Sequence, residues 1–270
     1  MADVFSPFEV WRRFLALPND SRGKTLGVAF GVALVAAMAV SVTSVALKPR
    51  QQAHLDALRE AQLAGMIATL PGLGDILRET GAETLETVLV DLRTSLISEA
   101  ADPQGFDFLA AQTDPAQSTA LSSEQDIAGI GRRPDLAPVY LLSGQEGLAL
   151  VVLPVYGTGY QSTIRAYLAL SGDLTTVAGL SIYEQGETPG LGSRITDPVW
   201  QGLWAGKQAL SPVGEVVIRV VRGTAQGPSE VDGISGATRS TTGVTRLVAF
   251  WLGAEGYGPF LSALKAGGRP

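Results

Sequence analysis

The longest apolar run in the chain covers residues 26–47 and contains no charged side chain. Arg22 and Lys24 precede this run, and Lys48 and Arg50 follow it. A helix rises about 1.5 Å per residue, so roughly 20 residues cross the hydrocarbon core of a bilayer. A core helix normally has a polar face, and the apolar region of a cleaved signal is shorter. The pattern therefore predicts one retained transmembrane helix over residues 26–47.

After this run, apolar positions recur at helical spacing over 51–70 and again over 75–97, with charged residues between them. We expect a helix that continues from the membrane, followed by a second helix or a helix–strand pair. Residues 101–126 are polar, rich in small side chains and interrupted by prolines, which predicts a loop or an irregular excursion. Arg132 and Arg133 precede a proline and are expected in a solvated turn, with a partner-docking patch as the alternative.

The second half of the chain contains short runs of alternating or β-branched residues. Glycine-bearing turns separate these runs, and spacing this tight is typical of an antiparallel meander. The strands expected on this basis are 139–142, 148–156, 163–170, 177–183 and 215–221.

Two further helices are predicted in this part of the chain. Asp197 followed by a proline has the order of an N-cap and a first helical residue, which opens a short helix through Trp200 and Trp204. Residues 240–252 place apolar side chains, Trp251 among them, on one face, and a glycine follows. The tryptophans are expected in the core. The fold class predicted is α+β: one N-terminal transmembrane helix, then a single domain with an antiparallel-rich sheet flanked by helices.

The amino-acid composition excludes several classes of binding partner and catalytic site. Charged residues make up 17% of the 270 residues, below the roughly 25% usual in soluble domains. Lys and Arg number 20 against 26 for Asp and Glu, a net charge of −6, whereas a nucleic-acid binder needs a basic face. We therefore expect no nucleic-acid partner. No cysteine and one histidine argue against disulfides, iron–sulfur clusters, Ser-His-Asp catalysis and metal sites. Any redox chemistry then requires a cofactor that these absences permit.

The orientation of the apolar segment is predicted from its flanking charges. Four basic residues precede it and three follow it within a comparable stretch, which favours a cytoplasmic N-terminus only slightly. Phe8, Trp11 and Leu15 recur at helical spacing beside arginines, a pattern of helices that lie on anionic membrane lipid. A frayed terminus with scattered aromatics explains the same residues equally well. We interpret 1–25 as cytoplasmic and the chain after residue 47 as lying on the opposite side of the membrane.

Three glycine-rich segments are candidates for chemistry. DGISGAT, residues 232–238, precedes a predicted helix whose free N–H groups suit a phosphate, although a turn with an N-cap cluster explains the same residues. GETPGLG, residues 186–192, has a Pro-Gly turn with polar neighbours and fits either the edge of a flat heterocycle or an ordinary connection. GTGYQS, residues 157–162, fits a hairpin loop and lacks the third glycine of a dinucleotide-binding fingerprint.

GETPGLG and DGISGAT, in this order, resemble the FMN-binding domain of membrane electron-transfer complexes. The segments GTGYQST and YLALSGDLTTV and the C-terminal WLGAEGYGPFL narrow the resemblance. With them the chain is similar to the NqrC family, whose members are subunits of the Na⁺-translocating NADH:quinone reductase. The related RnfG component of Rnf-type complexes shares the flavin motifs, but it is usually shorter and lacks the WLG…GPFL ending.

The resemblance implies a cofactor and the residues that hold it. Thr238 matches the residue that carries FMN through a phosphodiester, attached from FAD by a flavin transferase. The other implied cofactor-binding residues are Asp232, Ser235, Gly236 and Ala237 of the same motif, and Glu187, Thr188, Leu191 and Gly192 of the loop against the isoalloxazine. Two positions depart from the family pattern. Gln185 stands where relatives often have histidine, and Gln161 where an aromatic residue commonly follows the GxG turn.

The resemblance also implies an organisation and a function. We expect a cytoplasmic segment (1–25), a transmembrane helix (26–47), a helical or irregular membrane-proximal part (48–133) and an FMN-binding core (134–270). The chain would carry electrons within a sodium-exporting NADH:quinone reductase in the bacterial inner membrane, with its C-terminal domain periplasmic. Its partners would be the other subunits, the flavin transferase and membrane lipid. The alternatives are an RnfG-type component of an ion-translocating complex and a membrane-tethered structural or binding module without flavin.

Overall fold

The computed structural model describes residues 21–69, 86–99, 102–103, 105–144 and 147–267, together with residues 12, 16 and 18. The interfacial helix expected within 1–25 and most of the helix expected at the start of 75–97 lie outside the described residues. The chain forms two compact units, Met1–Arg59 and Glu60–Pro270, each of which is described by itself.

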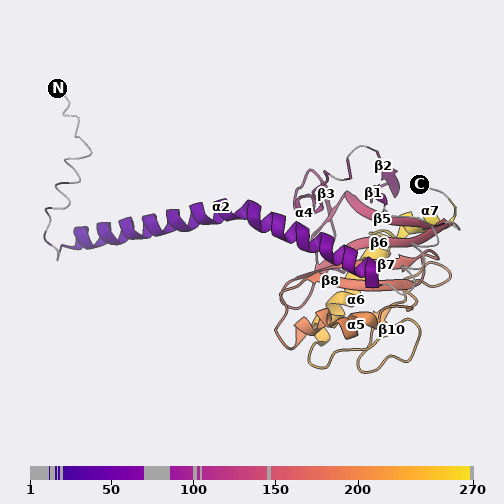
Figure 1. Ribbon diagram of the computed structural model, residues 1–270. Coiled ribbons are helices and arrows are strands. Elements are labelled where there is room, and N and C mark those ends of the chain that lie inside the picture. Colours follow the sequence, from indigo (N-terminus) through magenta and orange to yellow (C-terminus); the bar gives the residue numbers. More distant parts are fainter. Residues whose placement is uncertain are drawn as a thin grey trace. The chain divides into compact units, whose positions relative to one another are not determined.

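A single long helix, α2 (Arg22–Thr69), accounts for the N-terminal apolar run (Figure 1). It includes both the segment predicted at 26–47 and the helix predicted to continue over 51–70. Its window Arg22–Thr43 has a mean hydropathy of 2.2, and none of that window is buried within the chain. Among the described residues, this helix alone is long and apolar enough to cross a membrane. Lys48 ends the apolar run without ending the helix.

An antiparallel sheet of six strands is the centre of the second unit, with the order β2-β1-β5-β6-β7-β8 (Figure 1). Its strands are β1 (Glu86–Asp91), β2 (Leu96–Ser98), β5 (Leu136–Gly144), β6 (Gly147–Thr158), β7 (Thr163–Ser171) and β8 (Val177–Glu184). The meander predicted from the turn spacing is confirmed in β5–β8. The described part of 75–97 forms strands, and β1 pairs with β5, so the sheet draws on residues before and after position 134.

Both faces of the central strands are buried. Successive side chains of a strand point to opposite faces, so Val151 and Leu153 of β6 belong to the main core while Val152 belongs to a smaller cluster on the other face. Helix α6 (Thr238–Leu252) packs against β6, and the indole N–H of its buried Trp251 donates to the Tyr156 carbonyl at 2.7 Å. This packing fixes where the start of α6 lies relative to the sheet.

The predicted N-cap at Asp197 and the predicted end of α6 are confirmed, but α5 ends at Gly202, before Trp204, and α6 begins at Thr238, two residues before the predicted start. The Asp197 carboxylate accepts a hydrogen bond of 2.9 Å from the Val199 N–H and caps α5 (Pro198–Gly202), which follows the short 3-10 helix η1 (Gly192–Thr196). Helix α6 ends at Leu252 and Gly253 follows it, as predicted, and Trp200, Trp204 and Trp251 are buried. Two helices were not predicted: α4 (Phe108–Ala111) and α7 (Gly258–Lys265).

The strand predicted at 215–221 is largely wrong. Only Arg219–Val220 forms a strand, β9, and it pairs in parallel with β10 (Glu230–Val231). The reason is the local partner: the Val220 N–H donates to the Thr245 hydroxyl of α6 at 3.0 Å, so this backbone group serves a helix contact rather than a longer ladder.

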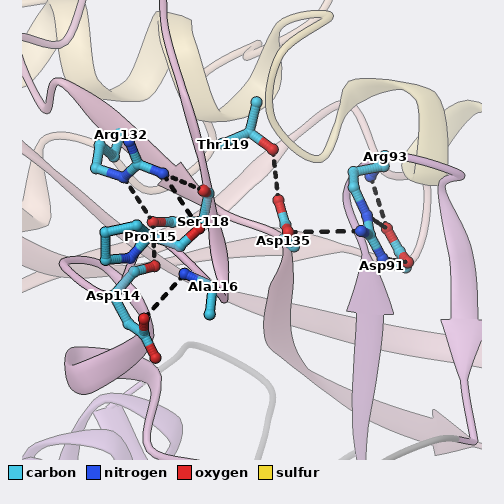
Figure 2. Close-up of polar contacts among 9 residues, drawn as sticks. All are labelled: Asp91, Arg93, Asp114, Pro115, Ala116, Ser118, Thr119, Arg132 and Asp135. Atoms are coloured by element: carbon cyan, nitrogen blue, oxygen red, sulfur yellow. Dashed lines mark hydrogen bonds and ion pairs between the residues drawn. The ribbon is translucent and has the colours of Figure 1, made fainter.

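The solvated turn predicted at Arg132 and Arg133 is also wrong. Both residues belong to strand β4 (Arg132–Pro134), which pairs with β3 (Ser118–Ala120). Arg132 Nε donates to Ser118 Oγ at 2.9 Å (Figure 2). Arg133 is buried, and its Nη1 donates to the Glu255 carbonyl at 2.6 Å. The sequence did not predict these contacts, because Ser118 and Glu255 lie 14 and 122 positions away from the arginines that they contact.

An acidic residue next to β4 joins this segment to the sheet. Asp135 accepts a hydrogen bond of 2.6 Å from the Thr119 hydroxyl and lies 3.5 Å from Arg93 Nη1 (Figure 2). Arg93 in turn pairs with Asp91 at the end of β1, at 2.7 Å. These partly exposed contacts connect Asp135 and Thr119 to the end of β1, although exposed ion pairs contribute little to stability.

Candidate functional site

A buried carboxylate ties together three segments that are far apart in the sequence. Glu187 is 4% exposed and follows β8. Its Oε1 accepts hydrogen bonds from the backbone N–H groups of the β6–β7 turn, Tyr160 and Gln161 at 3.0 Å and Ser162 at 3.3 Å. Its Oε2 accepts from the Ser240 hydroxyl of α6 at 2.5 Å. The 187–192 loop, the β6–β7 turn and the start of α6 therefore converge on one side chain.

The electrostatics of this contact favour the ionised form of Glu187. Burial raises the pKa of the carboxyl, but the hydrogen bonds from Ser240 and from the three backbone N–H groups outweigh that effect. The net pKa lies below its ordinary value near 4.5. At neutral pH the side chain is therefore a carboxylate, which suits it to accept several hydrogen bonds at once.

Glycines allow this close approach. A Cβ on Gly192 would lie 2.5 Å from Ser240 Oγ and 2.9 Å from Glu187 Cβ, and a Cβ on Gly159 would lie 2.5 Å from Glu187 Oε1. No larger residue fits at either position without movement of its neighbours. Glycines from two different motifs thus serve the same contact.

A cavity of about 240 Å³ opens in front of this junction. Five of the predicted site residues line it: Thr188, Leu191, Gly192, Gly236 and Thr238. Tyr160, Arg239 and Ser240 also line it. The Arg239 guanidinium carbon stands 4.9 Å from the centre of the Tyr160 ring, a cation–π contact between the β6–β7 turn and α6. The fold therefore brings the two glycine-rich motifs to the same hollow.

The start of α6 offers unpaired donors to this cavity. Its N-cap residue, Ala237, provides no side-chain hydrogen bond. Within the described residues, the backbone N–H groups of 238–240 and the Thr238 hydroxyl have no hydrogen-bond partner, and Thr238 is exposed. A helix N-terminus with free N–H groups and the positive end of the helix dipole attracts anions.

Comparisons with known proteins agree with this geometry. The FMN-binding domain family matches residues 159–253, which contain the whole cavity. The chain is 40% identical over 258 residues to the NqrC protein of the Na(+)-translocating NADH-quinone reductase of Pseudomonas aeruginosa, across 92% of this chain and 98% of the relative. It is 39% identical to the corresponding protein of Yersinia pestis, across 92% of this chain and 95% of that one. The chain belongs to the NqrC family of Na⁺-translocating NADH-quinone reductases.

Solved structures of the NqrC family share the fold. The crystal structure of Shewanella oneidensis NqrC matches with a TM-score of 0.67 and 34% identity, over 78% of this chain and 98% of that one. The NqrC protein of Parabacteroides distasonis matches with a TM-score of 0.51 and 26% identity, over 69% of this chain and 89% of that one. The resemblance deduced from the motifs is confirmed, and these relatives are NqrC rather than RnfG proteins.

Four predicted site residues of this NqrC-family chain lie outside the cavity lining. Asp232 Oδ1 accepts a hydrogen bond of 2.7 Å from the Ala225 N–H, so its carboxylate holds the preceding loop. Ser235 is exposed, and Ala237 is buried as the N-cap of α6. Glu187, the fourth, does not line the cavity, but its carboxylate accepts a hydrogen bond from Ser240, which does. The motif therefore contains residues that shape the loop as well as residues that face the hollow.

The two departures from the family pattern have local partners. Gln185 Oε1 accepts a hydrogen bond of 2.6 Å from the Glu187 N–H, which stabilises the turn that leads into the loop. Gln161 Nε2 lies 3.4 Å from the Thr188 hydroxyl and joins the β6–β7 turn to the same loop. In both positions glutamine makes a hydrogen bond that supports the wall of the cavity.

Sequence reasoning missed the joint role of Tyr160 and Ser240. Both lie inside or beside the segments that were singled out, but their partners are Arg239 and Glu187. Ser240 and Glu187 are 53 positions apart, and spacing along the chain does not predict such a pair. The sequence offered only an acidic residue beside a glycine as a signal, and the burial that makes its carboxylate require hydrogen-bond donors is visible only in the structure.

Proposed function

We propose that this NqrC-family protein holds FMN through a phosphodiester on the Thr238 hydroxyl, with the phosphate at the start of α6 and the flavin ring at the cavity. The chain is an electron-carrying subunit of a Na⁺-translocating NADH-quinone reductase, an oxidoreductase complex, and FMN is its cofactor. The observation that carries the proposal is the free Thr238 hydroxyl at an uncapped helix start, on the wall of a cavity inside the FMN-binding segment.

The residues around Thr238 fit a phosphodiester. The N–H groups of 238–240 would hold the phosphate oxygens, and the helix dipole stabilises negative charge at this end of α6. Arg239 adds a cation next to the attachment point, which offsets the remaining charge of the diester. The carboxylates of Asp232 and Glu187 accept hydrogen bonds from other groups of the chain, which partly offset their negative charge.

The size of the cavity fits a ring that stays partly exposed. About 240 Å³ is less than the roughly 300–1,000 Å³ of sites that enclose a whole drug-sized ligand. Leu191 is 48% exposed and Tyr160 is 50% exposed, so apolar and aromatic surface is available at the rim. FMN, when bound, supplies the one- and two-electron chemistry, while the protein sets its position and access. A partly exposed ring can exchange electrons with two neighbouring proteins of the complex.

The wider setting is proposed from the same family membership. α2 anchors the chain in the inner membrane, with 1–25 cytoplasmic, the domain after the helix periplasmic, and membrane lipid around the apolar window. A flavin transferase attaches the cofactor, and the covalent bond prevents its loss outside the cytoplasm. Electron transfer through this FMN contributes to sodium export coupled to quinone reduction.

The attachment is tested by intact mass of the full chain co-expressed with the flavin transferase. The wild-type chain should gain the mass of FMN less one water, located on a peptide that contains Thr238, and should fluoresce on a denaturing gel. Thr238→Val should remove both signals. Thr242→Val is the matched control, since Thr242 is an exposed threonine one helical turn later in α6. A wild-type chain without the added mass, or an unchanged Thr238→Val signal, would refute the attachment.

A further inference from the structure

A second cavity, of about 150 Å³, lies beside the β6–β7 turn. Thr158 and Thr163, the residues at the two ends of that turn, line it, whereas Tyr160 at the middle of the turn lines the cavity proposed for the flavin. Gln112, Tyr156 and Arg165 also line it. The function proposed above uses none of these three side chains.

All three side chains carry a buried polar atom without a hydrogen-bond partner. Within the part of the chain that the structure describes, Gln112 Nε2, the Tyr156 hydroxyl and Arg165 Nε have no hydrogen bond. Gln112 is 7% exposed and Tyr156 is 5% exposed, so bulk water does not solvate them. Native proteins pair nearly all buried polar groups, and several unpaired ones around one cavity indicate a bound molecule.

The unpaired atoms are hydrogen-bond donors. Arg165 Nη1 donates to Gln112 Oε1 at 2.6 Å, and because arginine only donates, this contact fixes the amide with its NH₂ group unpaired. Burial raises the pKa of the Tyr156 phenol far above its ordinary value, and the opposing effect of nearby Arg165 is smaller. The phenol therefore keeps its proton at neutral pH. A complementary ligand must present acceptor atoms.

The charges around the cavity favour an anion. Among the described residues, Arg165 is the only charged one in its lining. Glu184 Oε2 lies 3.4 Å from Arg165 Nε without forming an aligned hydrogen bond, and the Glu184 side chain is 44% exposed. The negative charge of Asp126 also raises the pKa of Tyr156. The two oxygens of this carboxylate, however, accept hydrogen bonds of 2.8 Å from the Ile130 and Gly131 N–H groups. The cation is therefore only partly neutralised.

We propose that this cavity binds a small carboxylate, whose two oxygens accept hydrogen bonds from Gln112, Tyr156 and Arg165. An arginine with further donors matches a planar carboxylate better than a spherical anion. A cavity of about 150 Å³ is large enough for a molecule the size of benzene, so an acid of two or three carbons fits. The proposal does not depend on the attachment of FMN at Thr238.

Acetate binding to the full chain in detergent tests the proposal. Saturation-transfer NMR of the acetate methyl group, titrated at constant ionic strength, should give a saturable signal. Acetamide has the same shape without the charge and should bind at least ten-fold more weakly. Tyr156→Phe should weaken acetate binding about ten-fold, the effect of one hydrogen bond to a charged group. The same variant should keep the wild-type melting temperature without acetate, because the lost hydroxyl has no partner among the described residues.

Two more variants sharpen the test. Gln112→Glu keeps an acceptor for Arg165 but replaces the free NH₂ group with negative charge, so acetate binding should be lost. Tyr167→Phe changes a buried tyrosine of the cluster on the other face of the sheet and should leave acetate binding unchanged. The proposal is overturned if the acetate signal does not saturate, which means that the cavity holds water alone. It is equally overturned if acetamide or chloride competes as well as acetate, or if Tyr156→Phe binds acetate as tightly as the wild type.

Discussion

Replacement of Glu187 by glutamine removes one negative charge and almost no volume from the junction behind the cavity. The carbonyl oxygen of the amide can still accept from the β6–β7 turn, and the Ser240 hydroxyl can rotate to accept from the new NH₂ group. The contact therefore persists as a neutral one. Glu187→Gln thus isolates the part of the stability that comes from ionisation.

The magnitude follows from the hydrogen bonds that Glu187 accepts. A hydrogen bond to an ionised group contributes about 1.5–3 kcal/mol, and one between neutral groups about 0.5–1.5 kcal/mol. Loss of the charge therefore costs about 1 kcal/mol for each donor. Three backbone N–H groups and the Ser240 hydroxyl donate to this carboxylate, so we expect a loss of about 4 kcal/mol of unfolding free energy. For a domain of this size that corresponds to a fall of about 8–16 °C in melting temperature.

The difference in melting temperature between the wild type and Glu187→Gln should depend on pH. The pKa of Glu187 is lower in the folded chain than its ordinary value near 4.5. A carboxyl with a depressed folded-state pKa stabilises the fold fully above the unfolded pKa, and this contribution is lost as the pH falls through the folded value. The gap in melting temperature should therefore be constant from pH 7 to about pH 5 and narrow below pH 4.5.

The assay is thermal unfolding of the full chain in detergent, followed by circular dichroism between pH 7 and pH 3. Glu215→Gln is the matched control, because Glu215 is exposed and should change the unfolding free energy by less than about 0.5 kcal/mol. A gap for Glu187→Gln that stays the same down to pH 3 would show that ionisation of Glu187 does not stabilise the fold. A gap no larger than that of the control would contradict the assigned hydrogen bonds.

Two further predictions concern the loop and the membrane. Gly192→Ala places a Cβ 2.5 Å from Ser240 Oγ and should cost about 2 kcal/mol and reduce the yield of covalent flavin. Gly202→Ala, in α5 with no atom within 4 Å of the new Cβ, should be neutral in both thermal unfolding and flavin yield; equal losses would argue against the close approach at Gly192. The chain has no cysteine, so Val213→Cys, at a position 81% exposed, should react with a membrane-impermeant maleimide on spheroplasts, whereas Ala2→Cys should react only after lysis. The reverse pattern would contradict the proposed orientation.

Features that depend on neighbouring residues were predictable from the sequence. The strands β5–β8 follow from short apolar runs between glycine turns, and the cap at Asp197 follows from its proline neighbour. Helix α6 follows from one apolar face that ends at Gly253. Each signal spans a few residues, because helix periodicity, strand alternation and turn chemistry are local properties. The motifs GETPGLG and DGISGAT are equally local, and together with the C-terminal WLGAEGYGPFL they sufficed to place the chain in its family.

Features that depend on distant partners were decided by the tertiary structure. The short strand β9 was overpredicted because Val220 donates to α6, and Arg133 is buried because its guanidinium reaches Glu255, 122 positions away. The sequence alone marked Glu187 as a residue of a loop. Only the folded chain brings it to the β6–β7 turn and to Ser240, because packing of α6 against β6 determines which donors surround a buried carboxylate.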